Sequence, residues 1–245
     1  MNFNFNLVKK QSFIFKALIY MKVHVGLNIK RIKNKKTLAF VESFNNKTFF
    51  FNIKRIIWDI KQSLFFIKNI LLNGGFILII CGFNFHDKQW LTKITHYFNK
   101  YNIHIINKEW TGGVLTNLFG LKKTFNNFKY SPELSIKDFY TSKIIEKLKN
   151  KRKQQINLFF TKFDILENIY TTPDLVLLLT DHGKTKGNSY LIKELTQLEI
   201  PLIAFIRSTV NSKLIDFPIL CNNTSIPFLK FYLILLNRII SNFFK

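Results

Sequence analysis

The stretch "NGGFILIICG", Asn73–Gly82, decides the fold class of this chain. Apolar residues at helical spacing precede it, namely Ile56, Ile60, Leu64, Ile67 and Leu71. The Asn-Gly-Gly sequence then supplies residues that tolerate the left-handed conformation at the end of a helix. The apolar run that follows has the length of a strand and no alternation, which is typical of a strand buried on both faces of a sheet. The stretch therefore predicts a helix leading into a parallel sheet.

The same alternation of helix and strand continues along the chain. The pattern predicts helices over 87–101 and 189–198 and from about residue 227, and strands over 103–106, 174–179, 200–206 and 217–221. Two short strands around a polar turn, Ser43–Lys47, form a hairpin-like entry. Alternating strands and helices predict an α/β fold, with a parallel sheet covered by helices on both faces.

Residues 117–170 interrupt this pattern and contain no strand candidate. A first helix is expected over 116–129, and a capping box, Ser135–Asp138, opens a second, strongly basic helix. We therefore expect a basic helical hairpin inserted into the α/β domain. The predicted organisation is a basic N-terminal segment over 1–36, an α/β domain over 37–116 and 171–245, and the insertion over 117–170.

The charge of the chain points to a polyanionic partner. Its 245 residues carry a net charge of +23, which a nucleic acid or an anionic membrane surface would neutralise. No apolar run reaches the roughly 18–20 residues that span a bilayer, so no membrane insertion is expected. Lys outnumbers Arg by 32 to 5 and Phe occurs 28 times, a bias typical of AT-rich genomes such as many organelle genomes. The first acidic residue is Glu42, so the N-terminus resembles an import peptide, yet a cleaved presequence would be absent from a chain that begins at Met1. Because synthesis inside the organelle reconciles both facts, we expect an organelle-encoded chain.

Signatures of catalysis are missing from the sequence. Gly183–Thr185 follows a predicted strand, but a phosphate-binding loop needs another glycine at position 178, where the chain has Leu178. No GxGxxG turn, GxSxG nucleophile or HExxH metal motif occurs. Asp174 follows Pro173 at the start of a predicted strand, and Asp181 has no partner carboxylate in sequence. We predict no enzyme activity, no cofactor, no metal site and no small-molecule substrate.

Basic residues instead favour nucleic-acid binding. They spread over Lys22–Lys36, Lys122–Lys129 and Lys143–Lys153 and do not gather in one pocket. Spread charge fits a phosphate backbone, so we expect recognition of folded RNA by shape and phosphate contacts. No signature of an RNA-recognition sheet appears, so base stacking on a sheet is not expected.

Four motifs in order carry a family resemblance. "EWTGGVLTN", Glu109–Asn117, resembles the W-x-G-G-x-L-T-N loop of the universal small-subunit ribosomal protein S-two family. "KVHVG", Lys22–Gly26, resembles the G-V-H-x-G motif of that family. "PDLVLLL" from Pro173, with Glu194 and an Ile-Pro pair beyond it, and "DFPILCNN", Asp216–Asn223, resemble two later segments. The resemblance covers about residues 18–243.

The resemblance implies a flavodoxin-like parallel sheet with a protruding two-helix coiled-coil hairpin. It also implies a structural constituent of the small ribosomal subunit that contacts rRNA and neighbouring small-subunit ribosomal proteins and catalyses nothing. Departures at Glu109, Lys22, Leu27 and Arg207–Thr209 suit a divergent organellar member. We expect a ribosome-bound protein of the mitochondrial matrix, with the plastid as the alternative compartment. A non-ribosomal RNA-binding α/β protein and a degenerate Rossmann-like nucleotide-binding enzyme are the rival interpretations.

Candidate RNA-binding residues come from two sources. The residues that match the family motifs are Lys22, His24, Trp110, Gly112, Gly113, Thr116 and Asn117. The residues chosen for their charge are Lys30, Arg31, Lys33, Lys35, Lys36, Lys122 and Lys123. Three more are chosen for their place on the predicted basic hairpin, namely Lys149, Lys151 and Arg152. In the Trp-Gly-Gly turn we expect the indole to be an anchor, glycine to permit a tight turn, and Thr116 or Asn117 to cap the next helix. Glu109, where a basic residue is expected, favours a turn that aims the basic hairpin at rRNA.

Overall fold

The computed structural model describes residues 14–28, 41–45, 48–81, 88–108, 110–130, 169, 171–179, 186–206 and 214–243. The chain forms two compact units. One comprises Met1–Trp110 with Pro173–Lys245, and the other comprises Thr111–Thr172. The domain boundaries expected from the sequence, including an insertion over 117–170, stay a prediction.

A five-stranded parallel sheet forms the core of the larger unit. Along the sheet, the strands are β5 (Ile103–Ile106), β4 (Ile77–Ile80), β6 (Leu175–Leu178), β7 (Leu202–Ile206) and β8 (Phe217–Leu220). Every residue of β4, β6 and β7 is buried, as the uninterrupted apolar runs predict. Counted from β4 along the chain, the strands lie in the order 2-1-3-4-5, which is the order of flavodoxin-like sheets.

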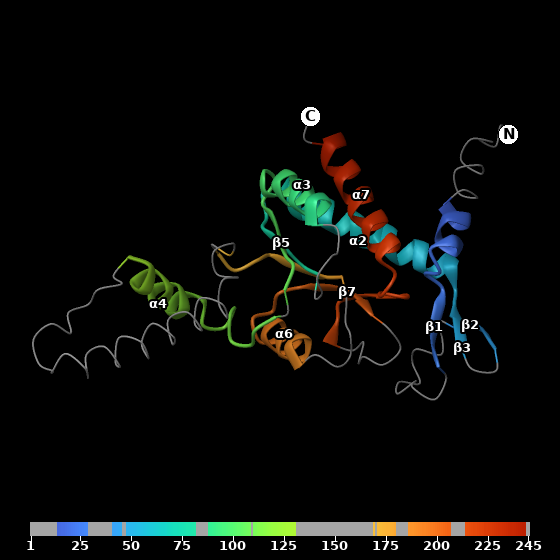
Figure 1. Cartoon of the computed structure of the whole chain (residues 1–245), viewed down its shortest axis with the longest axis horizontal. Helices are drawn as coiled ribbons and strands as arrows, with labels where there is room; N and C mark the ends of the chain where they lie inside the picture. Colours follow the sequence, from blue (N-terminus) through green and yellow to red (C-terminus); the bar gives the residue numbers. More distant parts are fainter. Residues whose placement is uncertain are drawn as a thin grey trace, which may run out of the picture. The chain divides into compact units, whose positions relative to one another are not determined.

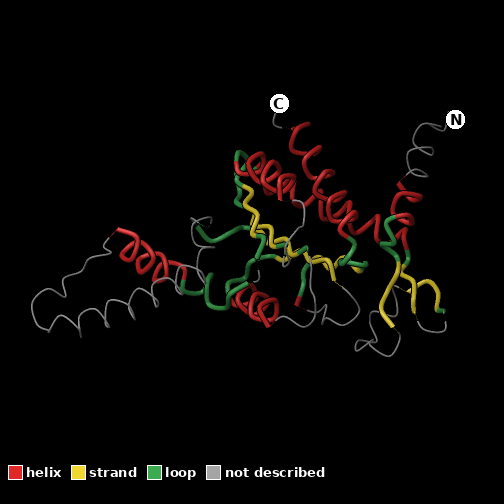
Figure 2. Tube along the Cα trace, viewed as in Figure 1, coloured by secondary structure: helices red, strands yellow, loops and turns green. Residues whose placement is uncertain are grey.

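Within the described residues, four helices cover this sheet. They are α2 (Ile53–Leu72), α3 (Lys88–Asn99), α6 (Lys186–Gln197) and α7 (Ile226–Phe243). Figure 1 shows α2, α3 and α7 on one face of the sheet and α6 on the other. The alternating red helices and yellow strands of Figure 2 confirm the α/β pattern predicted from the sequence.

The ends of α2 follow from its sequence. The Asn52 side chain accepts a hydrogen bond from the backbone N–H of Arg55 at 3.2 Å, which caps the N-terminus. At the other end Gly74 has φ +75°, so the predicted left-handed cap is confirmed. The helix therefore stops where β4 begins.

Helix α7 packs against α2 through a buried polar contact. The hydroxyls of Ser63 and Tyr232 lie 3.0 Å apart, and both side chains are fully buried. Within the described part of the chain, α7 is the one helix that is long and apolar enough to cross a membrane, with 18 residues and a mean hydropathy of 1.2. A core helix passes the same test, and Lys230 and Arg238 interrupt its apolar sequence.

A second, three-stranded antiparallel sheet lies in the N-terminal part of the same unit. It is formed by β1 (Val25–Asn28), β3 (Thr48–Phe51) and β2 (Val41–Phe44), in that order. The predicted hairpin of β2 and β3 is confirmed. Strand β1 was not predicted. It is four residues long, and its pairing with β3 shifts register, so it leaves no clear period in the sequence.

In the smaller unit, the structure describes α4, Leu118–Tyr130, which confirms the first predicted hairpin helix. The second helix, with its capping box at Ser135–Asp138, lies outside the described residues.

Candidate nucleic-acid interface

The first motif, at Lys22–Gly26, follows a short helical segment over residues 14–20. The backbone N–H of Val23 donates to Leu18 O at 3.2 Å, and both side chains are buried. Lys22 has φ 54°, an uncommon conformation for a residue with a side chain, and its side chain is exposed. The chain therefore turns sharply at a lysine that faces solvent.

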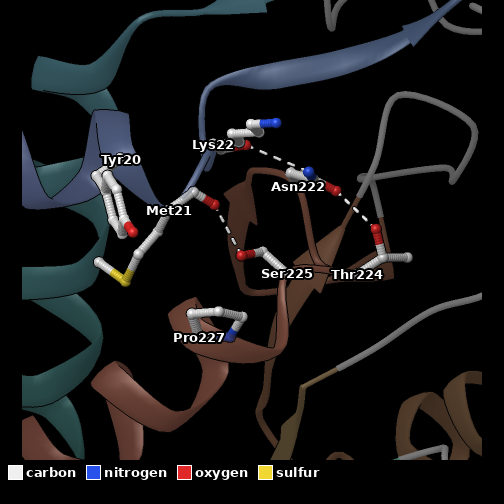
Figure 3. Close-up of a pocket in the computed structure, with 7 residues that line it drawn as sticks. All are labelled: Tyr20, Met21, Lys22, Asn222, Thr224, Ser225 and Pro227. Carbon is white, nitrogen blue, oxygen red and sulfur yellow. Dashed lines mark hydrogen bonds between the residues drawn. The ribbon is translucent and has the colours of Figure 1, made fainter.

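A segment two hundred residues away holds this turn in place (Figure 3). The side-chain amide of Asn222 donates to Lys22 O at 3.2 Å, and the Asn222 backbone N–H donates to Val23 O at 2.8 Å. The Ser225 hydroxyl donates to Met21 O at 2.7 Å. Two motifs that the sequence suggested separately, "KVHVG" and "DFPILCNN", thus form one hydrogen-bonded structure.

A hollow of about 280 Å³ opens beside these hydrogen bonds. Its lining residues are Tyr20, Met21, Lys22, Asn222, Thr224, Ser225 and Pro227. Tyr20 is 88% exposed, so its ring is open to a stacking partner, and no acidic side chain lines the hollow. An aromatic ring, an ammonium group and hydroxyls form a combination that can bind a nucleotide base and its phosphate.

Two further residues of the first motif pack inward. The ring of His24 stacks on Phe50 with centroids 5.7 Å apart, and burial lowers the His24 pKa, an effect that the nearby carboxylate of Glu42 opposes. A Cβ atom at Gly26 would collide with the ring of the fully buried Phe49. Glycine at this position therefore permits close packing of β1 on β3.

The motif at Glu109–Asn117 contains a buried anchor, Trp110. Trp110 is 3% exposed, and its indole Nε1 donates to Glu194 Oε1 of α6 at 3.3 Å. This confirms the predicted anchoring role of Trp110. Because Glu194 belongs to another motif segment, the two segments are joined by this contact.

The glycine turn and the helix that follows it lie in the smaller unit. Gly113 has φ +86°, which confirms that glycine permits the turn. Gly112, Thr116 and Asn117 are exposed. The Asn117 carbonyl accepts the first backbone hydrogen bond of α4, from Leu121 N at 3.0 Å, so Asn117 occupies the cap position.

The predicted basic residues are only partly described. Lys123 is exposed and Lys122 is half-buried, and burial lowers the Lys122 pKa. The others lie outside the described residues, namely Lys30, Arg31, Lys33, Lys35, Lys36, Lys149, Lys151 and Arg152. Their RNA-binding role stays a prediction. Sequence reasoning missed Tyr20, Asn222 and Ser225, although the paired asparagines of "DFPILCNN" were a signal for the second of them.

The motif carboxylates tie strand ends together. Asp174 Oδ2 accepts from Phe76 N at 2.7 Å, next to the starts of β6 and β4. Asp216 Oδ2 accepts from Leu202 N at 2.8 Å, next to the starts of β8 and β7. Among the described residues, no cluster of three His, Cys, Asp or Glu side chains could hold a metal. These carboxylates have a structural role.

The fold and these sites define an α/β protein with a flavodoxin-like parallel sheet, in which hydrogen bonds join motif segments that lie far apart in the chain. Comparison with known families matches residues 18–242 to the family described as Ribosomal protein S2. Because this match covers most of the chain, the chain belongs to the Ribosomal protein S2 family, and it is not an enzyme.

Individual relatives agree with the family match. The small ribosomal subunit protein uS2 of Endomicrobium trichonymphae is 25% identical over 218 residues, which cover 89% of this chain and 85% of that protein. The uS2 protein of Carsonella ruddii is 28% identical over 226 residues, 92% of this chain and 97% of that protein. The uS2m protein of Marchantia polymorpha is 24% identical over 231 residues, 92% of this chain and 90% of that protein.

Proposed function

We propose that this chain is a structural constituent of the small ribosomal subunit of a mitochondrion, where it binds rRNA by phosphate and shape contacts. The observation that carries the proposal is the family match over 18–242. The structure supports it, because hydrogen bonds join motif segments that lie far apart in the chain. A net charge of +23 supplies the attraction to rRNA phosphates.

The compartment is supported by composition and by one relative. The preference for Lys over Arg, 32 to 5, fits an AT-rich organelle genome, and the Marchantia polymorpha relative is a uS2m protein. The other relatives named here are bacterial uS2 proteins at similar identity. The proposal therefore includes the plastid as the alternative compartment.

Within this function, we assign the hollow beside Lys22 to an rRNA backbone segment. Lys22 neutralises a phosphate and the exposed ring of Tyr20 lies beside a base, while Asn222 holds the backbone at Lys22 through its bond to Lys22 O. Lys149, Lys151 and Arg152, which the sequence predicts to be RNA-binding, add to the same electrostatic attraction.

Sedimentation tests the proposal. A tagged chain in an organelle lysate should sediment with the small subunit at low salt and stay there after a high-salt wash. Fractionation of mitochondria and plastids before lysis tests the compartment. A chain that sediments free of ribosomes at low salt would show that the proposal is wrong.

Charge reversal tests the binding surface. Lys22→Glu should lower incorporation into the subunit and reduce the dependence of RNA affinity on salt by about one phosphate contact. Lys93→Glu, on the exposed face of α3, is the matched control. Replacing Lys149, Lys151 and Arg152 with Glu should weaken incorporation more than it changes stability. Unchanged incorporation would remove the hairpin from the interface.

A further inference from the structure

Helix α2 carries a regular line of side chains on its outer face, which we call the α2 stripe. Its members are Lys54, Trp58, Lys61, Phe65, Lys68 and Leu72. Lysine and a large apolar residue alternate at steps of four and three residues, so each type recurs every seven residues. Residues at this spacing lie on one side of a helix.

The stripe lies on a different face of α2 from the one that the helix buries. The buried residues of the helix are Ile53, Ile56, Ile60, Ser63, Leu64, Ile67 and Leu71. In contrast, Trp58 is 55% exposed, Phe65 is 60% exposed and Leu72 is 54% exposed. Three large apolar side chains in one exposed line are unusual on a protein surface and indicate a contact with a partner.

The charge of the stripe is wholly positive. Lys54 and Lys61 are exposed, and Lys68 lies with its Nζ 3.7 Å from the ring centroid of Phe243 on α7. The one acidic residue of α2, Asp59, lies off the stripe and forms an ion pair with Arg55 at 3.0 Å. The stripe therefore complements a negatively charged partner.

We propose that the α2 stripe docks an amphipathic helix of a partner protein, with acidic side chains flanking its apolar face. A seven-residue repeat is the spacing at which two helices keep their contact faces together. Trp58, Phe65 and Leu72 would pack between the apolar side chains of the partner. The three lysines would face its Glu or Asp residues, which adds specificity to the apolar contact.

The spacing favours a helix over RNA or a membrane. Trp58 and Phe65 are two helical turns apart, roughly 10.5 Å, which is about three times the spacing of stacked bases. A helix that lies in a membrane surface needs a broad apolar face, whereas the apolar line of the stripe is one residue wide. The inference rests on the proposed function in one respect: the partner is sought in the small ribosomal subunit.

A binding assay tests the stripe without ribosomes. The probe is a fluorescein-labelled peptide of four heptads, with Leu at the apolar positions and Glu at the flanking positions, titrated with the full chain. Replacing Lys54, Lys61 and Lys68 with Glu should weaken binding by about tenfold or more. Replacing Lys93, Lys100 and Lys193 with Glu changes the net charge equally and should leave binding unchanged.

Three results of this assay would overturn the proposal. One is equal loss of binding in the two charge-reversed variants, which would show attraction without a site. Another is unchanged peptide binding by the double variant Trp58→Ala, Phe65→Ala, whose fold is checked by circular dichroism. The third is stronger binding of the stripe to a uridine oligonucleotide or to vesicles of phosphatidylserine than to the peptide, with loss of that binding in the Lys54, Lys61 and Lys68 variant.

Photocrosslinking tests the stripe in the assembled particle. Phe65→p-benzoylphenylalanine in the full chain should give, in the small-subunit fractions of a gradient, a protein adduct that maps to an acidic amphipathic helix. Tyr190→p-benzoylphenylalanine, at an exposed residue of α6, should not give this adduct. An RNase-sensitive adduct or no adduct at position 65 would overturn the inference. Sedimentation outside the small subunit with intact peptide binding would contradict only the proposed function.

Discussion

The buried hydroxyl pair between α2 and α7 allows a quantitative prediction. Ser63 Oγ donates to Ile60 O at 2.8 Å and lies 3.0 Å from the Tyr232 hydroxyl. Since the serine hydroxyl has one hydrogen, the tyrosine donates and the serine accepts. Both side chains are fully buried, so a hydroxyl that loses its partner here cannot turn to water.

The two single substitutions should therefore differ. Tyr232→Phe removes the donor but leaves Ser63 bonded to Ile60, and it should cost about 0.5–1.5 kcal/mol. Ser63→Ala leaves the Tyr232 hydroxyl buried without a partner, which costs about 1–3 kcal/mol, offset by roughly 0.5 kcal/mol of helix propensity. The double variant removes both polar groups, so it should be more stable than Ser63→Ala alone.

Urea unfolding of the full chain, followed by circular dichroism at the helix band, measures these differences. The midpoint should fall most for Ser63→Ala and partly recover in the double variant, with an unchanged slope. Ser241→Ala, at an exposed serine of α7 that also bonds the carbonyl three residues back, is the control and should change little. A double variant less stable than Ser63→Ala would refute the reasoning.

Three further predictions concern single contacts. Trp110→Phe removes the donor to the buried Glu194 carboxylate and should cost about 1.5–3 kcal/mol, whereas Trp90→Phe should cost less; urea midpoints compare the two. Gly113→Ala should cost about 1–2 kcal/mol, because the residue has φ +86° while a Cβ atom there meets nothing within 4 Å; Gly113→Asn, which tolerates this conformation, should cost less in the same measurement. For Asp59, burial raises the pKa from 3.8 to about 6, although Arg55 opposes this. The resulting stabilisation is fully present below pH 3.8 and is lost as the pH rises through about 6, so Asp59→Asn should flatten the pH dependence of the urea midpoint over that window, and an unchanged profile would contradict the assignment.

Local patterns predicted most of the α/β core because they depend on neighbours in sequence. The uninterrupted apolar runs of β4, β6 and β7 reflect burial on both faces of the sheet. The spacing of apolar residues in α2 reflects burial of one face of the helix. Strand β1 escaped prediction because its stability comes from pairing with β3 and from the packing of Phe49 against Gly26, neither of which leaves a local period. The anchoring of Trp110 was predicted, but its partner was not.

The candidate site was predicted as a set of residues and not as a structure. Motif matching selected Lys22 and Trp110 but gave no reason to join them to Asn222 or Glu194. Tyr20 was missed because an aromatic residue in an apolar segment is ordinarily assigned to the core, and only its 88% exposure distinguishes it. The α2 stripe was not predicted from the sequence, because its apolar residues are equally consistent with a helix that is buried all round. Only the structure shows that α2 buries a different face.

The sequence by itself determined the class of fold, the positive charge and the family motifs, because periodicity, charge and short motifs are properties of adjacent residues. Only the tertiary structure decided the strand order of the sheet, the bond from Asn222 to Lys22 and the exposed line of α2. Each of these depends on which surfaces are buried together across long separations in the chain. That choice is made by the packing of the whole core, which no single segment contains.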